Sequence, residues 1–155
     1  MLWIGIAATA VMILIAAVAF LTPSNRGYLT LRDSKTGELY ARFPADNGTE
    51  FSIAFVHSVN QAPVKDVFVV KDKTIQPVET IFFAFGAGMQ TDLQEGQKLV
   101  YHDDGSMSII GFDQSFDQLN YIVGTVSDHI LWIGGREESL RELCGKNAAI
   151  TIKAE

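Results

Sequence analysis

The feature that most constrains this chain is an uncharged apolar run from Leu2 to Leu21, LWIGIAATAVMILIAAVAFL. As a helix these residues would extend about 30 Å, the thickness of the hydrocarbon core of a bilayer. A helix that is apolar on every face needs a membrane or a large protein shell around it, and the rest of this 155-residue chain is too small to provide that shell. We therefore expect a transmembrane segment at residues 1–22, a linker at residues 23–27, and a separate domain at residues 28–155.

The apolar segment has two possible fates. Ala17-Val18-Ala19 resembles a signal-peptidase site, so the segment is either a signal anchor or a signal peptide cleaved after Ala19. No Lys or Arg precedes the segment, and long domains are translocated largely regardless of their charge. We expect the domain to lie outside the cytoplasm, held at the cell membrane as a single-pass protein by residues 2–21, or secreted if the segment is removed.

Charge and cysteine content narrow the class of the domain. The formal net charge is −6 and the pI is about 5.0, so the chain has no basic field to hold phosphate backbones, and we expect no nucleic-acid partner. The single cysteine, Cys144, cannot form an internal disulfide.

Beyond the apolar run, short alternating apolar stretches are separated by turn residues, which is typical of antiparallel strands. Residues 34–37 and Asp104-Gly105 are predicted hairpin connections, the second with two residues, and Asn47-Gly48 is a predicted type I′ turn. The predicted strands are residues 28–32, 38–43, 51–58, 66–70, 80–85, 98–102, 106–112, 121–126, 129–133 and 149–153.

One helix is predicted near the C-terminus. Ser139 and Glu142 have the spacing of a capping box, and Gly145 stands where a C-terminal cap belongs. Leu140, Leu143 and Cys144 form the apolar stripe of this helix. Together with the strands, this predicts a mainly β protein: an antiparallel β-sandwich or partly open barrel with one short C-terminal helix, preceded by an N-terminal transmembrane helix.

His57 and Ser58 stand side by side where an apolar strand is predicted to enter a turn. Side chains alternate along a strand, so His57 shares a face with Phe55, whereas Ser58 points to the opposite face. His57 is therefore poorly placed to activate Ser58 as a nucleophile. We interpret the pair as a structural corner, in which Ser58 begins the turn and Pro63 stiffens its exit, and which doubles as part of a binding edge.

A metal site is an alternative use of the histidines. The spacings match no established zinc or calcium motif, and we predict neither metal nor cofactor. An arrangement of ligands that converge only in space would escape this search, so a metal-dependent or hydrolytic envelope enzyme using His57 stays the alternative function. The ligands available to such a site are His57, His102 and His129, with Asp103, Asp104 and Asp128 beside two of them.

A second unusual stretch is FGAGMQTD, residues 85–92. Its glycines allow a positive φ or a close backbone approach. The stretch lacks the third glycine of a dinucleotide-binding motif and the lysine of a phosphate-binding loop. A tight bend at a sheet corner explains it best. The candidate binding residues of the two turns, without a catalytic role, are His57, Ser58, Pro63, Gly86, Gly88, Met89 and Gln90.

The segments HSVNQAPVKDVF, FGAGMQTD and SDHILWIGG followed by SL resemble those of the domain of unknown function 1850 family. The resemblance extends from about Tyr28 to the C-terminus. The matching positions are His57, Ser58, Val59, Pro63, Asp66 at the acidic position, and Gly86 to Met89.

The resemblance implies a small extracytoplasmic protein of the kind often encoded beside TRAP transporters of the TAXI type. It thus implies a non-catalytic accessory role in solute uptake. The implied partners are a TAXI-type solute-binding protein or the membrane subunits of the TRAP transporter.

Overall fold

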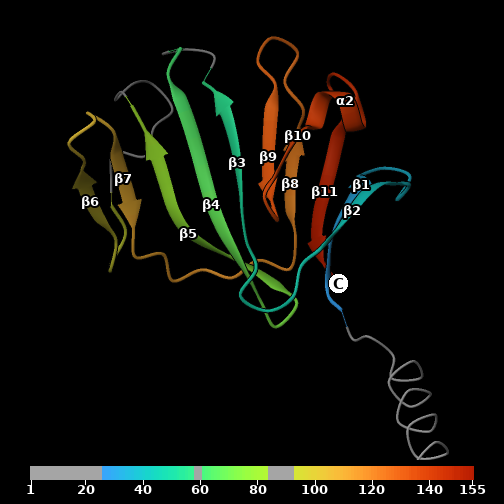
Figure 1. Ribbon diagram of the computed structural model, residues 1–155, viewed down its shortest axis with the longest axis horizontal. Coiled ribbons are helices and arrows are strands. Elements are labelled where there is room, and N and C mark those ends of the chain that lie inside the picture. The colour runs from blue at the N-terminus through green and yellow to red at the C-terminus, as the bar shows by residue number, and fades with distance from the viewer. Residues whose placement is uncertain (1–25, 58–60, 84–92) are drawn as a thin grey trace, which may run out of the picture.

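The computed structural model describes residues 26–57, 61–83 and 93–155. These residues form two antiparallel sheets and one short helix, and they close no barrel (Figure 1). The smaller sheet has the order β2 (Leu39–Pro44), β1 (Tyr28–Asp33), β11 (Ala149–Ala154) and β8 (Leu119–Ile122). The larger sheet has the order β10 (Arg136–Ser139), β9 (His129–Ile133), β3 (Glu50–Val56), β4 (Pro63–Lys71), β5 (Thr74–Phe82), β7 (Met107–Ile110) and β6 (Lys98–Tyr101). The predicted antiparallel, mainly β fold is confirmed.

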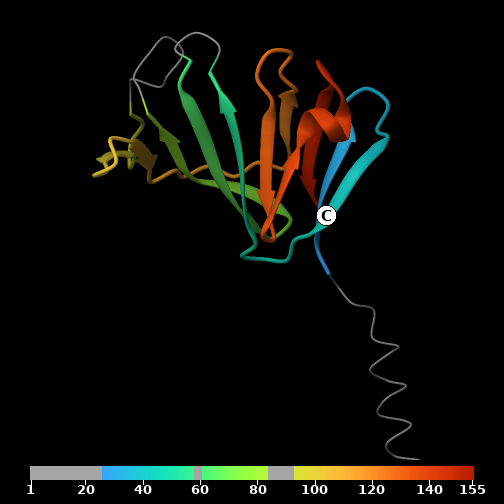
Figure 2. The same ribbon diagram turned by 45° about the horizontal axis from the view of Figure 1, so that its top comes forward.

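The main core lies between the two sheets. Leu31 and Ile152 of the smaller sheet and Ile53 of the larger sheet are fully buried, and the Phe51 and Phe68 rings stack at 5.2 Å. Burial of each such side chain contributes about 1.5–3 kcal/mol. The larger sheet extends beyond the smaller one (Figure 2), and its β5 and β7 side has a second apolar cluster. The buried members of that cluster are Val64, Phe82, Met107 and Ile109.

The predicted helix is confirmed as α2 (Leu140–Cys144). The Ser139 side chain caps its start by accepting a hydrogen bond of 3.0 Å from the backbone N–H of Glu142. Gly145 ends the helix with φ 92° and donates its N–H to the carbonyl of Arg141. A positive φ costs glycine little, which explains this residue at the cap.

Two predicted turns form with different geometry. In the Asn47-Gly48 turn only Gly48 has a positive φ, 85°, so the predicted type I′ turn is wrong and the pattern is that of type II. The Asp104-Gly105 hairpin forms, but three residues separate His102 and Ser106, which are joined by a backbone hydrogen bond of 3.0 Å. Gly105, with φ 84°, occupies the position at which three-residue loops require the left-handed conformation.

Strand boundaries also differ from the prediction. β3 ends at Val56, before His57. β5 begins at Thr74, six residues before the predicted start, and β10 (Arg136–Ser139) was not predicted. Among the residues given above, no helix is long and apolar enough to span a membrane, and the run from Leu2 to Leu21 lies outside them.

Candidate functional site

Two of the predicted binding residues, His57 and Pro63, lie within the described part of the chain. His57 is half-buried and follows β3, so its predicted place on the strand is wrong. Its backbone N–H donates to the Ala62 carbonyl, and its carbonyl accepts from Gln61, both at 2.9 Å. These bonds join His57 to the two residues that precede β4. The other predicted residues, Ser58, Gly86, Gly88, Met89 and Gln90, lie outside the described residues.

The strands that lead into the two predicted turns, β3 and β5, are not direct neighbours but lie on either side of β4. β3 pairs with β4, which brings Val56 opposite Pro63, and β4 pairs with β5, which brings Val64 opposite Phe82. The chain therefore leaves β3 and β5 at the same end of the larger sheet (Figure 1). We call this the upper end, and it is where the described binding residues lie.

The outer face of the larger sheet has a groove of about 580 Å³ at the upper end. One wall comes from β4 and β5 and the other from the loop between β6 and β7. The Phe83 side chain is 50% exposed at this groove, although it is a large aromatic residue. The lining residues are Ala54, Pro63, Val64, Lys65, Glu79, Ile81, Phe83, His102, Asp104 and Ser106.

Hydrogen bonds fix the polar wall of this groove. His102 Nε2 lies 2.6 Å from Ser108 Oγ, and Asp104 Oδ1 accepts from both the hydroxyl and the backbone N–H of Ser106. The Ser106 hydroxyl and its backbone N–H lower the pKa of Asp104, which keeps this exposed carboxylate ionised. On the other wall, Lys65 Nζ lies 5.5 Å from the centre of the Trp132 ring. The groove therefore offers both signs of charge beside an exposed aromatic ring.

The inner face of the same sheet holds a carboxylate, Asp66. It points to the same side of β4 as the buried residues Val64 and Phe68, which lie two positions before and after it. Thr80 Oγ1 on β5 donates a hydrogen bond of 2.8 Å to Asp66 Oδ1. Burial raises the pKa of Asp66, and the hydrogen bond from Thr80 offsets part of the rise. No salt bridge reaches Asp66 from the described residues.

Aromatic rings contact one another on the same side of the larger sheet and across from the smaller one. The His129 ring stacks on Phe55 at 5.0 Å, and Tyr121 of the opposite sheet meets His129 at 5.8 Å. Burial lowers the pKa of His129, so the ring is neutral at pH 7. Its Nδ1 accepts the N–H of Gly124 at 3.2 Å, which places the ring proton on Nε2. Burial, together with the charge of Asp66, raises the pKa of Tyr121.

Asp128 connects this region to α2. Asp128 Oδ1 accepts from the backbone N–H groups of His129 at 2.7 Å and Arg141 at 3.1 Å, and its Oδ2 accepts from the Ser139 hydroxyl. Arg141 in turn donates to the carbonyls of Gly124 and Val126. This network gives the Ser127-Asp128-His129 and Ser139-Leu140 segments a structural role: they lock the loop before β9 onto the start of the helix.

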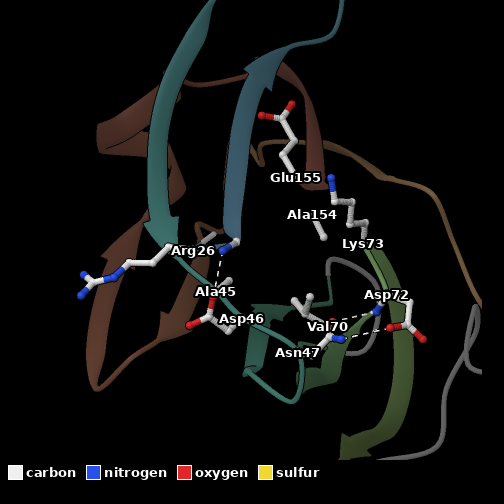
Figure 3. A pocket seen from close by; sticks show the side chains of 10 residues that line it. Arg26, Ala45, Asp46, Asn47, Val70, Asp72, Lys73, Ala154 and Glu155 are labelled. Atoms are coloured by element: carbon white, nitrogen blue, oxygen red, sulfur yellow. Dashed lines mark hydrogen bonds between the residues drawn. The ribbon is translucent and has the colours of Figure 1, made fainter. Parts of the chain in front are cut away.

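A larger cavity, of about 880 Å³, lies at the opposite end of the sandwich (Figure 3). Gly27 donates its N–H to Asp46 Oδ1 at 2.8 Å, and Asn47 and Asp72 exchange hydrogen bonds of 3.0 and 2.8 Å. Arg26, which follows the undescribed N-terminal residues, lines this cavity with Lys73 and Glu155. These hydrogen bonds tie Gly27 to the Asp46-Asn47 turn, and that turn to the turn between β4 and β5.

The histidines do not form a metal centre in the described part of the chain. His102 lines the outer groove, whereas His129 stacks on the inner face of the sheet. Within residues 26–57, 61–83 and 93–155, no three His, Cys, Asp or Glu side chains are grouped to hold a metal ion. This observation gives no support to the alternative of a metal-dependent enzyme.

Sequence reasoning named Asp66 at the acidic position of the family resemblance but not among the candidate binding residues, and it missed Tyr121. The signal for Asp66 was present, because Val64, Asp66, Phe68 and Val70 alternate on one face of a strand, which puts the carboxylate on the core side. No local signal identified Tyr121, since it reaches Asp66 only through the packing of one sheet on the other.

Comparison with known proteins gives one match. A family model described as "Domain of unknown function (DUF1850)" matches residues 51–140. This range includes the outer groove from Ala54 to Ser106, as well as Asp66, Tyr121 and His129. No curated protein and no solved structure matches the chain.

Proposed function

The chain belongs to the DUF1850 family, and from this premise we propose that it is a non-catalytic accessory protein of a TAXI-type TRAP solute transporter. In this proposal, residues 2–21 anchor the domain at the outer side of the cell membrane. The outer groove then binds the solute-binding protein or the membrane subunits of the transporter. The transporter is included in this proposal because the segments around His57 and Gly86 resemble those of the family.

The observation that carries the binding role is the exposed aromatic ring beside the groove. Phe83 is 50% exposed and Val56, at the same end of the sheet, is 39% exposed. Exposed apolar groups rimmed by charged ones are typical of surfaces that bind other proteins. Lys65 and Glu79 on one wall and Asp104 on the other supply that rim. Val56, Lys65 and Glu79 lie on strands of the sheet, which limits the entropic cost of binding, whereas Phe83 directly follows β5 and Asp104 lies in the loop between β6 and β7.

The groove is better suited to binding a protein partner than to catalysing a reaction. His102 Nε2 lies within hydrogen-bond reach of the Ser108 hydroxyl, but Ser108 is fully buried, so a substrate does not reach that hydroxyl, and Asp104 bonds to Ser106 of its own hairpin. The groove is also open on the outer face of the sheet, where water reaches its walls. Shape, charge and an aromatic anchor are what it offers, and these are the features of an interface.

Co-purification from a detergent extract of membranes tests this function. The wild-type chain, carrying an affinity tag, should retain the solute-binding protein or a transporter subunit. Phe83→Ala should weaken retention about tenfold, which is the loss expected for an interface anchor. Val126→Ala is the matched control, because Val126 is an aliphatic residue that is 89% exposed outside the groove.

Both variants should keep the melting temperature of the wild type, since exposed substitutions change stability by about 0.5 kcal/mol or less. Equal retention of the partner by wild type and Phe83→Ala would refute the groove as the interface. Failure to recover any transporter component with the wild type would refute the accessory role. Protease added to spheroplasts tests location independently: it should digest the domain, and complete protection would contradict an extracytoplasmic position.

A further inference from the structure

The outer groove combines an apolar lining with charged side chains. Ala54, Pro63 and Ile81 come from three adjacent strands of the larger sheet, and Phe83 follows directly after β5. The Phe83 side chain is 50% exposed. Its volume of about 580 Å³ lies within the range of ligand sites in proteins. An apolar side chain of a partner would therefore lose contact with water here.

The charges of the groove are divided between its two sides. The Lys65 ammonium lies 5.5 Å from the centre of the Trp132 ring, which belongs to β9. In the strand order, β9 lies on one side of β4, and β5, β7 and β6 lie on the other. Lys65 thus extends toward β9, whereas Glu79 on β5 and Asp104 in the loop between β6 and β7 line the other side. That side of the groove is acidic.

Both carboxylates on this side are available to a partner. Asp104 is ionised because the hydrogen bonds from Ser106 lower its pKa. Among the residues that the structure describes, neither Glu79 nor Asp104 forms an ion pair with a basic side chain. Lys98, which pairs opposite Ile110 on β7, does not line the groove. A cationic group of a partner would supply the missing counter-charge.

The two carboxylates and the exposed ring specify the kind of partner. A guanidinium group has five N–H donors in one plane and can bond to more than one carboxylate, whereas an ammonium group is a compact charge. Pairs of aromatic rings attract each other beyond the effect of the buried area. We propose that the outer groove binds an exposed segment of a partner protein in which an arginine adjoins an aromatic residue. The arginine bonds to Glu79 and Asp104, and the aromatic ring packs on Phe83. This inference rests on the proposed function, because it takes the outer groove as the interface.

The dipeptide N-acetyl-phenylalanyl-arginine amide tests this chemistry. Titrated into the full chain in detergent micelles, it should give saturable 15N–1H shifts at Glu79, Ile81, Phe83 and Asp104. The same dipeptide with citrulline in place of arginine keeps the shape without the charge and should bind about tenfold more weakly. Replacing its phenylalanine by alanine should also weaken binding. Equal binding of the arginine and citrulline forms, or no saturable shift at these residues, would overturn the proposal.

Variants of the groove test the two carboxylates. Glu79→Gln and Asp104→Asn each remove one charge at nearly constant size, and the amide oxygen of Asp104→Asn still accepts from Ser106. Each change should weaken binding of the arginine dipeptide about threefold, and both together about tenfold. The matched controls are Glu50→Gln, at the exposed start of β3, and the exposed Asp117→Asn; both should bind as the wild type does. Unchanged binding in the double variant would contradict the role of the carboxylates.

Co-purification separates this inference from the proposed function. The double variant should retain the transporter component about tenfold less than the wild type. If the double variant retains the component fully, the arginine-binding proposal is wrong although the accessory role stands. If the wild type recovers no transporter component but binds the dipeptide in a charge-dependent way, the accessory role is wrong and the preference of the groove for arginine stands.

Discussion

Thr80 and Asp66 are joined by a hydrogen bond of 2.8 Å across β4 and β5, on the face of the larger sheet that points toward the smaller sheet. The bond supplies one donor to a partly buried carboxylate. Burial is the larger effect, and it raises the pKa of Asp66 above the ordinary value of 3.8. The sheet thus keeps an acidic group at a position where an apolar residue would stabilise it more.

The first prediction follows from the sign of this shift. Because the folded pKa lies above the unfolded one, the folded state holds the proton more tightly. Stability is therefore highest below the unfolded pKa of 3.8 and falls as the pH rises through the raised pKa. Asp66→Asn should be more stable than the wild type at pH 7, by about 1 kcal/mol. Urea unfolding should show this difference shrinking toward pH 3.8, and a constant difference would contradict it.

The second prediction concerns Asp128, which holds the start of α2. Asp128→Ala removes the acceptor for the N–H groups of His129 and Arg141 and for the Ser139 hydroxyl. Hydrogen bonds to a charged partner contribute about 1.5–3 kcal/mol. We therefore expect a loss of about 2 kcal/mol in the free energy of unfolding. Asp117→Ala is the exposed control and should stay within about 0.5 kcal/mol of the wild type; equal losses in both would argue against the network.

The sequence predicts the elements whose pattern is local. Alternation of Leu29 and Leu31 identifies β1, and Ser139, Glu142 and Gly145 mark both ends of α2. The predicted strand began at Thr80, so it missed the first part of β5, which contains Pro77, a residue that is uncommon inside strands. The structure accommodates that proline beside a bulge, where the pairing shifts between Val67 and Phe68.

Other differences depend on tertiary partners. β10 (Arg136–Ser139) is mostly charged, and it forms a strand because it pairs with β9 at the edge of the sheet. Asn47 does not adopt the predicted positive φ, because its side chain bonds to Asp72 in the next hairpin. Asp72 and Lys73 form the two-residue turn with φ of 51° and 62°, and without glycine nothing in the local sequence marks it.

The candidate site also has one part that the sequence predicts and another part that it does not. The segment around His57 and Pro63 could be located from the sequence, since an apolar strand ends there in turn residues. The convergence of Asp66, Tyr121 and His129 could not, because it depends on which strands pair and on how one sheet faces the other. Pairing between distant strands is the part of a β fold that local patterns do not specify.

The third prediction concerns Gly124, in the loop that precedes β9. A Cβ at this position would lie 2.0 Å from the carbonyl oxygen of Ser127 and 3.6 Å from His129 Cε1. Gly124→Ala must therefore displace the loop, and the loss of stability should exceed the roughly 1 kcal/mol expected of a strained turn glycine. Gly37→Ala is the matched control, because Gly37 has φ 74° with nothing within 4 Å of the added carbon.

Thermal melts of the two variants measure the difference. A larger loss for Gly124→Ala than for Gly37→Ala is expected, together with shifted amide resonances for His129, whose Nδ1 accepts from Gly124. Equal losses would mean that the loop relaxes at little cost, and the Gly124 contact would then not hold His129 in place.

The last prediction concerns the β1–β2 hairpin. Asp33 Oδ1 accepts the backbone N–H groups of Lys35 and Thr36, each at 2.8 Å, and its Oδ2 accepts the Tyr40 hydroxyl at 2.9 Å. The backbone donors, Thr36 first, lower the pKa of Asp33 to about 2. With the folded pKa below the unfolded one, the stabilisation is present above the unfolded value of 3.8 and disappears as the pH falls through about 2.

Asp33→Asn should therefore be less stable than the wild type at neutral pH, because a neutral amide accepts these three hydrogen bonds less strongly and its nitrogen cannot accept at all. The difference should narrow as the pH falls from 3.8 toward 2, since the wild-type carboxylate then becomes protonated. Urea unfolding of both proteins across this pH range measures the difference directly. Asp117→Asn, at an exposed position, corrects for general acid destabilisation. A wild-type advantage that persisted unchanged at about pH 2 would show that the hairpin does not depend on the charge of Asp33.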